Sequence, residues 1–198
     1  MGYDLVELEE QKKWTDRSTL VDKRYINSAQ YRRKFDLLSD DTKFVRLLFD
    51  ISKKMLMHRS GTIYEDMYWI DPKTISIVAQ KTDSIIPKKI RYSFKIKRII
   101  KKYEGLITIH THPDSFPPSI EDFISNFEHN YGVGLVICHN GQIYKYYSGE
   151  LINKAYCEMV LADFLKDGYN EIEAQARLIE HLKNNFDIKC EEVIGDDI

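Results

Sequence analysis

Two histidines and one aspartate, in the segment TIHTHPDSFPPSIED, have types and spacing suited to metal binding. His110 and His112 stand two apart on a strand expected at 106–112, so both imidazoles project to the same side. Asp122 falls in the first turn of a helix expected at 119–130. Two imidazoles and one carboxylate leave a fourth position for water, which is the arrangement of catalytic zinc sites. Zinc lowers the pKa of such a water to roughly 7, which makes hydroxide available at neutral pH.

Each part of this segment can also be explained without a metal. A His-x-His pair is a short pattern that arises by chance. Ser119 suits the N-cap of the helix, and Glu121 and Asp122 are favoured near the positive end of the helix dipole. The combination is more specific, because an apolar strand, His-Thr-His-Pro, a proline-rich loop and Ser-x-x-Asp follow in order. That order favours a metal site.

The combination resembles the motif of the JAMM (MPN+) zinc metallopeptidases, a deubiquitinase-like family with bacterial and phage members. The family motif has an upstream Glu, then His-x-His-Pro, a short loop and Ser-x-x-Asp. The matching residues here are His110, His112, Pro113, Ser119 and Asp122. The loop between the second histidine and the aspartate is shorter here than in the usual family pattern.

The resemblance implies a role for the matching residues. His110, His112 and Asp122 would hold one zinc ion, and Ser119 would donate a hydrogen bond to the developing oxyanion. The upstream Glu would take a proton from the zinc-bound water and pass it to the leaving amine. The implied activity is hydrolysis of a peptide or isopeptide bond in a protein or peptide substrate, and a ubiquitin-like conjugate is one candidate.

Two neighbouring carboxylates compete for the role of this general base. Glu65 matches the family pattern by position, and the alternation of a strand expected at 62–70 places it on one face with Ile63 and Trp69. A carboxylate on an apolar face is costly without a partner, which favours a functional role. Asp66, on the opposite face and one methylene shorter, is the alternative.

Two other classes of function stay open. A non-catalytic MPN-like protein-interaction module would use the same fold without a metal, although the intact ligand set argues against it. The second alternative, a nucleic-acid-associated factor, rests on segment 88–102, KKIRYSFKIKRIIKK, which carries eight basic residues. This run is either a patch for an acidic substrate, nucleic acid or partner, or the solvated face of an amphipathic helix. The solvated face is favoured.

The other histidines and cysteines show no ligand spacing. Cys138 and His139 are adjacent on an expected strand and point to opposite faces, so they predict a buried cysteine and a histidine near a turn. His58, His129 and His181 are expected on helix surfaces. Three scattered cysteines fit a reducing cytoplasm without a disulfide framework.

A scaffold of mixed helices and strands must position the candidate site. Apolar periodicity predicts helices at 28–38, 40–60, 93–103, 119–130, 154–167 and 171–185, and strands at 62–70, 74–79, 106–112, 134–139, 142–147 and 188–194. We therefore expect an α/β fold, and the resemblance implies a JAMM/MPN-like mixed sheet flanked by helices. Residues 42–150 would form the metallopeptidase domain, with an N-terminal helical extension or arm at 1–41 and a C-terminal helical extension at 151–198.

Composition excludes several classes of protein. With 43% hydrophobic and 30% charged residues, the chain reads as a soluble globular protein. It has no apolar run long enough for a membrane span, and its acidic N-terminus lacks the apolar core of a signal peptide. A net charge of −2 argues against a protein that coats nucleic acid. We expect a cytoplasmic enzyme.

Overall fold

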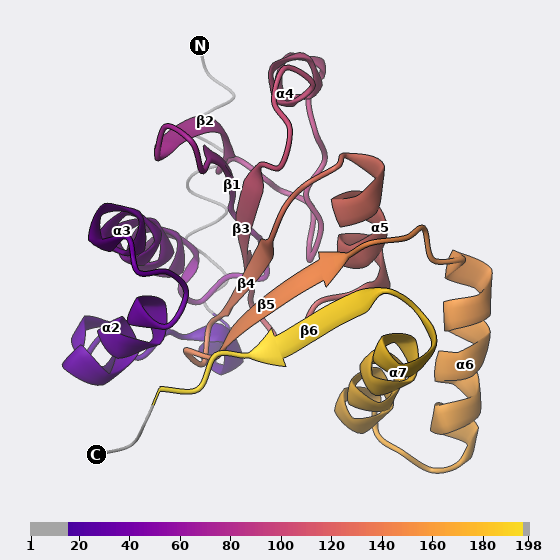
Figure 1. Ribbon diagram of the computed structural model, residues 1–198. Coiled ribbons are helices and arrows are strands. Elements are labelled where there is room, and N and C mark those ends of the chain that lie inside the picture. The colour runs from indigo at the N-terminus through magenta and orange to yellow at the C-terminus, as the bar shows by residue number, and fades with distance from the viewer. Residues whose placement is uncertain (1–15, 196–198) are drawn as a thin grey trace, which may run out of the picture.

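One six-stranded sheet forms the centre of the molecule in the computed structural model, which describes residues 16–195 (Figure 1). Its strands are β1 (Met67–Asp71), β2 (Ser76–Lys81), β3 (Ile107–His112), β4 (Gly134–Cys138), β5 (Ile143–Ser148) and β6 (Ile188–Glu192). Their spatial order is β2-β1-β3-β4-β5-β6. The sheet is mixed, because β3 and β4 run parallel while the other neighbouring pairs are antiparallel.

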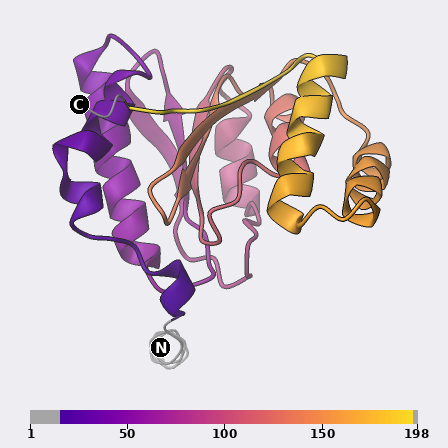
Figure 2. The ribbon, with the colours of Figure 1, turned by 90° about the horizontal axis from the view of Figure 1, so that it is seen from below.

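Helices cover both faces of this sheet. They are α2 (Ala29–Asp36), α3 (Thr42–Arg59), α4 (Phe94–Ile100), α5 (Ile120–Glu128), α6 (Lys154–Lys166) and α7 (Glu171–Asn185). Figure 2 shows the sheet between α2 and α3 on one side and α5, α6 and α7 on the other. The expected α/β fold, a mixed sheet flanked by helices, is confirmed.

The first face is covered by α3, whose sequence marks both its start and its apolar side. Asp41 caps the helix, and its carboxylate accepts hydrogen bonds from two backbone N–H groups of the first turn. Leu48 and Met55 project from one side of the helix and pack in a core that includes Tyr68 and Ile109 from the sheet. Each such aliphatic side chain contributes about 1.5–3 kcal/mol on burial.

The second face carries a separate core. Phe123 of α5, Leu178 and Leu182 of α7, and Val136 and Tyr146 of the sheet pack together there. Strand β6 follows α7 and pairs with β5, so the segment expected as a C-terminal helical extension also supplies an edge strand of the sheet. Helices α6 and α7 thereby lie beside α5, the helix that carries Asp122.

Strand β3 positions the histidines. Because its side chains alternate, Ile109 enters the core under α3, while His110 and His112 face the side covered by α5. The strand is hydrogen-bonded to β1 on one side and to β4 on the other, which fixes its backbone. The chain leaves β3 through loop 113–118 and enters α5, so the first turn of α5 lies close to the two imidazoles.

One predicted element begins later than expected. The strand expected at 62–70 starts at Met67, and residues 62–66 form no regular ladder. Their polar groups bind irregular partners instead: the Ile63 carbonyl accepts from Lys88 N, and Asp66 N donates to the side chain of Thr111. Ile63 is 37% exposed, so it does not share an apolar face with Glu65 as the alternation predicted.

The chain termini are described in part. Of the expected N-terminal extension at 1–41, residues 1–15 lie outside the described part; the remainder holds 3-10 turns at Arg17–Thr19 and Tyr25–Asn27, and helix α2. Tyr31 and Phe35 of α2 are fully buried in the core beneath α3. Within residues 16–195, no helix combines the length and apolar character needed to cross a membrane.

Candidate metal centre

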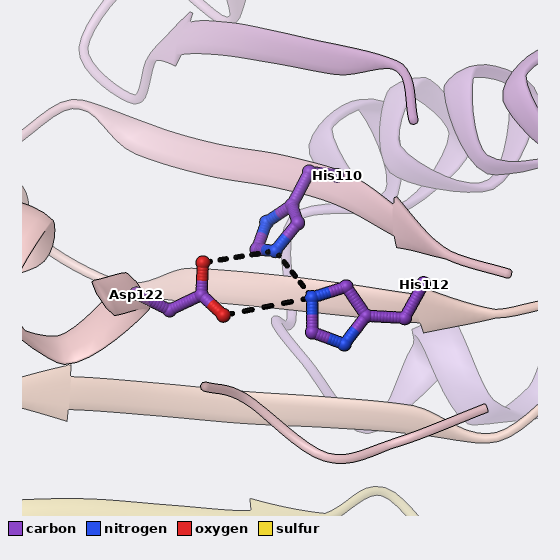
Figure 3. A group of neighbouring side chains, drawn as sticks. All are labelled: His110, His112 and Asp122. Atoms are coloured by element: carbon purple, nitrogen blue, oxygen red, sulfur yellow. Dashed lines mark hydrogen bonds and ion pairs between the residues drawn. The ribbon is translucent and has the colours of Figure 1, made fainter. Parts of the chain in front are cut away.

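The three candidate ligands meet at the end of β3. Figure 3 shows the carboxylate of Asp122 directed toward the imidazoles of His110 and His112. The Nε2 atoms of the two histidines are 3.1 Å apart. Asp122 Oδ1 lies 3.2 Å from Nε2 of His110, and Oδ2 lies 3.5 Å from Nε2 of His112. The sequence therefore identified residues that come together in space.

These spacings suit a tetrahedral ion. Two ligand atoms that each lie about 2.1 Å from a tetrahedral zinc are about 3.4 Å from one another. The three separations between the donor atoms, 3.1, 3.2 and 3.5 Å, all fall near this value. Both Nε2 atoms point at the same carboxylate, so neutral imidazoles could offer their lone pairs to one cation. The donor set and its geometry fit zinc.

A capping box holds the aspartate in place. Ser119 is the N-cap of α5, and its Oγ accepts a hydrogen bond from Asp122 N. The Asp122 carboxylate accepts in return from Ser119 N at 2.7 Å and from Ser119 Oγ at 2.8 Å. The structural explanation of Ser-x-x-Asp and the metal-site explanation are therefore compatible, because the cap itself aims the carboxylate.

The loop between the histidines and α5 is also fixed. His112 donates from Nδ1 to the carbonyl of Phe116 at 2.9 Å, which leaves Nε2 for a metal. The three prolines of the loop are buried, and Gln175 of α7 donates to the Pro118 carbonyl. Phe116 and Gln175 carry no sequence signal for these roles, because one acts through its backbone and the other approaches from a distant helix.

The electrostatics of the site link the histidines to Asp122. Burial disfavours the charged form of His112, but hydrogen bonding to Asp122 and its negative charge outweigh burial and raise the pKa of His112 to about 9. Burial likewise opposes ionisation of Asp122, but the nearby histidines hold the pKa of this carboxyl well below its usual range. The cluster therefore stabilises Asp122 in its ionised form and a positive charge beside it.

Glu65 borders the same cleft as the three ligands. Its side chain is largely buried, and within residues 16–195 its carboxylate has no ion-pair partner. Burial raises the pKa of Glu65, although the neighbouring His112 and His110 act in the opposite direction. A carboxylate with a raised pKa beside a metal site suits proton transfer near neutral pH.

Asp66, the alternative to Glu65, points to the other side of the sheet. Its carboxylate accepts a hydrogen bond from Arg59 Nε at 2.6 Å and contacts Nδ1 of His58 at 2.7 Å. Both Asp66 and Arg59 are buried, so the pair satisfies two charges within the fold. This environment leaves Asp66 a structural role. His58 is exposed on α3, as expected, and its contact with Asp66 adds to that position.

The site opens into a cleft of about 840 Å³. One part of the lining is aromatic, with Tyr92, Tyr131 and Tyr146 among its residues. Tyr131 accepts a hydrogen bond from the buried Trp69, and Tyr92 hydrogen-bonds Ser125 of α5. Further walls come from segment 88–97 and from α7. The sequence did not identify these walls, since they join positions far apart in the chain.

The remaining histidines and cysteines lie where packing places them. His139 is buried, not merely close to a turn, because its Nδ1 hydrogen-bonds the Thr19 carbonyl at 2.7 Å. His181 contacts Tyr156 on the neighbouring helix, and His129 stacks on Tyr131 at the cleft. All three cysteines are buried and unpaired. None of these residues belongs to the ligand group of the described chain.

The arrangement brings together three candidate metal ligands, a carboxylate of raised pKa and a solvent-accessible cleft. That set can activate a water and hold a carbonyl-containing substrate beside it. No protein-family model, curated protein or solved structure matches this chain.

Proposed function

We propose that the protein is a zinc-dependent hydrolase of JAMM type that cleaves a peptide or isopeptide bond. The observation that carries the proposal is the near-tetrahedral spacing of the donor atoms of His110, His112 and Asp122, with Glu65 on the same cleft. A purely structural cluster has no need of a cleft beside it or of an unpaired carboxylate at its edge. The motif resemblance supports the same reaction class.

Zinc, when bound, supplies Lewis-acid polarisation of a substrate carbonyl and of a water. Glu65 accepts the proton that this water loses and delivers it to the leaving amine. Its raised pKa makes this carboxylate a better proton acceptor than an exposed glutamate. Asp66 does not serve as this base, since it is engaged by Arg59 and His58.

Ser119 contributes in two ways. Its backbone N–H and hydroxyl orient Asp122 through the capping box. Its hydroxyl also borders the cleft, where it can turn toward the oxygen of the scissile carbonyl and stabilise developing negative charge. The aromatic lining formed by Tyr92 and Tyr131 offers the substrate an apolar surface beside the reacting group.

Metal content is the first test of this proposal. The wild-type protein, incubated with zinc and then dialysed, is expected to retain about one zinc per chain. The double variant His110→Ala, His112→Ala should retain none. His181→Ala is the matched control, because this histidine lies on α7 and contacts Tyr156. A wild-type protein that takes up no zinc would contradict the proposal.

Hydrolysis is the second test. We expect the zinc-loaded protein to cleave members of a quenched fluorescent peptide library or ubiquitin chains joined by isopeptide bonds, and chelation to stop the reaction. If the wild-type protein and the Glu65→Gln variant both bind zinc and both leave the two probes intact, the result would favour the non-catalytic interaction module.

We also propose a reducing location, the cytoplasm. Cys138, Cys157 and Cys190 are buried and unpaired, and the pKa of each thiol is raised, chiefly by burial. Thiols of this kind act as small apolar groups. Thiol titration of the protein purified from its native cell would find three free cysteines, whereas a disulfide-linked pair would contradict this location.

A further inference from the structure

One wall of the cleft is strongly basic. Lys88, Lys89 and Arg91, from the connection between β2 and α4, and Lys97, from α4, all line it. Their side chains are exposed. The same basic run continues to Lys102, but its last two lysines do not line the cleft. The run is therefore divided between residues that face the candidate active site and residues that do not.

The backbone of this wall is held in place. Buried Ser84 donates a hydrogen bond to the Lys89 carbonyl at 2.8 Å, and Lys88 N donates to the Ile63 carbonyl at 3.0 Å. Buried Arg59 donates to the Thr82 carbonyl at the start of the same connection. The cations are thus displayed on an anchored segment, so a ligand that binds them has less chain to order.

Most of this positive charge is not neutralised within the fold. Lys88 Nζ forms an ion pair with Asp114 Oδ2 at 2.8 Å, and Asp114 belongs to the loop that follows the histidines. Over residues 16–195, no carboxylate forms an ion pair with Lys89, Arg91 or Lys97. A substrate that brings carboxylates into the cleft would supply the missing partners.

Acidic side chains also line the cleft. Glu121 of α5 and Glu171 of α7 line it, and Glu121 is paired with Lys154. The cleft lining therefore carries basic side chains, acidic side chains and the candidate metal ligands. Acidic side chains of a bound peptide would be drawn to the basic residues.

We propose that Lys89, Arg91 and Lys97 form a specificity subsite for an acidic peptide segment next to the scissile bond. The inference rests on the proposed function, since it names the class of substrate that the hydrolase would select. A peptide fits better than a nucleic acid, because Glu121 and Glu171 would repel a continuous phosphate backbone. Separate carboxylates on a peptide can be spaced to meet the basic residues and avoid these two glutamates.

Peptide binding tests the subsite. The probes are a fluorescein-labelled glutamate-rich peptide and its glutamine counterpart, measured by anisotropy with zinc-loaded Glu65→Gln protein so that neither peptide is cleaved. We expect the glutamate peptide to bind about tenfold more tightly, and the preference to shrink as salt is added. Equal affinity for the two peptides would overturn the inference.

Charge reversal sharpens the test. Lys89→Glu with Arg91→Glu should remove the preference for glutamate and create one for a lysine-rich peptide of the same length. The matched control is Lys101→Glu with Lys102→Glu, in the same basic run but outside the cleft, and it should keep the wild-type preference. Circular dichroism melting confirms folding of both. A preference that survives reversal at 89 and 91, or is lost in the control, would contradict the subsite.

The remaining outcomes separate this inference from the proposed function. Tighter binding of a single-stranded oligonucleotide than of the glutamate peptide would overturn the inference in favour of nucleic acid. Equal cleavage of acidic and neutral peptides by the wild-type protein would remove the subsite and leave the hydrolase standing. Selective binding without zinc uptake would support the basic subsite as a peptide-binding surface and remove the hydrolase.

Discussion

Glu65 and Asp66 are neighbours in the chain, but they face opposite sides of the sheet and differ in the partners of their carboxylates. Asp66 faces α3, where Arg59 and His58 engage its carboxylate. Glu65 borders the cleft, where it has no cationic partner within the described chain and its pKa is raised by burial. Both are buried acids. Burial alone therefore does not distinguish a functional carboxylate from a structural one.

The difference lies in what compensates each buried charge. On the α3 side, an arginine neutralises Asp66, so breaking the pair would leave Arg59 as an uncompensated buried cation. On the α5 side, His110, His112 and Asp122 form a group that could hold a metal ion, and the carboxylate of Glu65 on the same cleft has no ion-pair partner in the described chain. A cleft lined by titratable groups of perturbed pKa is the better candidate for function.

Replacing the cleft carboxylate should have the largest effect. We expect Glu65→Gln to lower the rate of hydrolysis about 10²–10⁴-fold, because the general base is lost while the shape of the side chain is kept. Zinc content and the free energy of unfolding should stay close to wild type. Steady-state kinetics, metal analysis and urea unfolding check these outcomes, and retained turnover would remove Glu65 from the mechanism.

The corresponding change at the neighbouring acid should affect stability instead. We expect Asp66→Asn to lower the free energy of unfolding by about 3 kcal/mol, because Arg59 then stays buried without its counter-charge. Urea unfolding measures this loss, and kcat per folded molecule should stay close to wild type. If Asp66→Asn instead abolished turnover in a stably folded protein, the assignment of the two roles would be reversed.

Two serine caps extend the comparison. Ser119 caps α5 and orients Asp122 through a capping box, while Ser93 caps α4 by accepting a hydrogen bond from Ile96 N and contacts no candidate metal ligand. We expect Ser119→Ala and Ser93→Ala each to cost about 1 kcal/mol of stability. Only Ser119→Ala should also weaken zinc binding, by about 10–100-fold, measured by competition with a fluorescent chelator. Equal zinc affinity in both variants would show that the capping box does not support the site.

Much of the α5 side could be predicted because its signals are local. The alternation of β3 placed His110 and His112 together, and the N-cap pattern placed Asp122 in the first turn of α5. The family pattern and the expected strand alternation together narrowed the candidate general base to Glu65 or Asp66. The helices and strands were recovered for the same reason, since periodicity acts over a few residues.

Long-range contacts explain what the sequence did not show. The pairing of Asp66 with Arg59 depends on how α3 packs, and alternation along one strand cannot reveal it. Strand β1 begins at Met67 and not at residue 62, because the preceding residues bind Lys88 and Thr111, which lie in other segments. The cleft walls from α7 and segment 88–97 likewise depend on tertiary packing.

His139 and His112 also differ in how their surroundings shift the pKa. The pKa of His112 is raised by Asp122, whereas that of His139 is lowered, chiefly by burial. A lowered histidine pKa means that the unfolded chain binds more protons in acid. The stability linked to His139 is therefore present above its ordinary pKa of 6.5 and is lost as the pH falls.

We expect His139→Asn to make the unfolding free energy less dependent on pH below 6.5, because asparagine does not titrate and can still donate to the Thr19 carbonyl. Urea unfolding at a series of pH values, compared with wild type and with His181→Asn in the half-buried contact between α7 and Tyr156, measures the change in slope. An unchanged slope in His139→Asn would mean that other titrating groups cause the loss of stability in acid. Zinc binding should be unaffected, because His139 is not one of the candidate metal ligands.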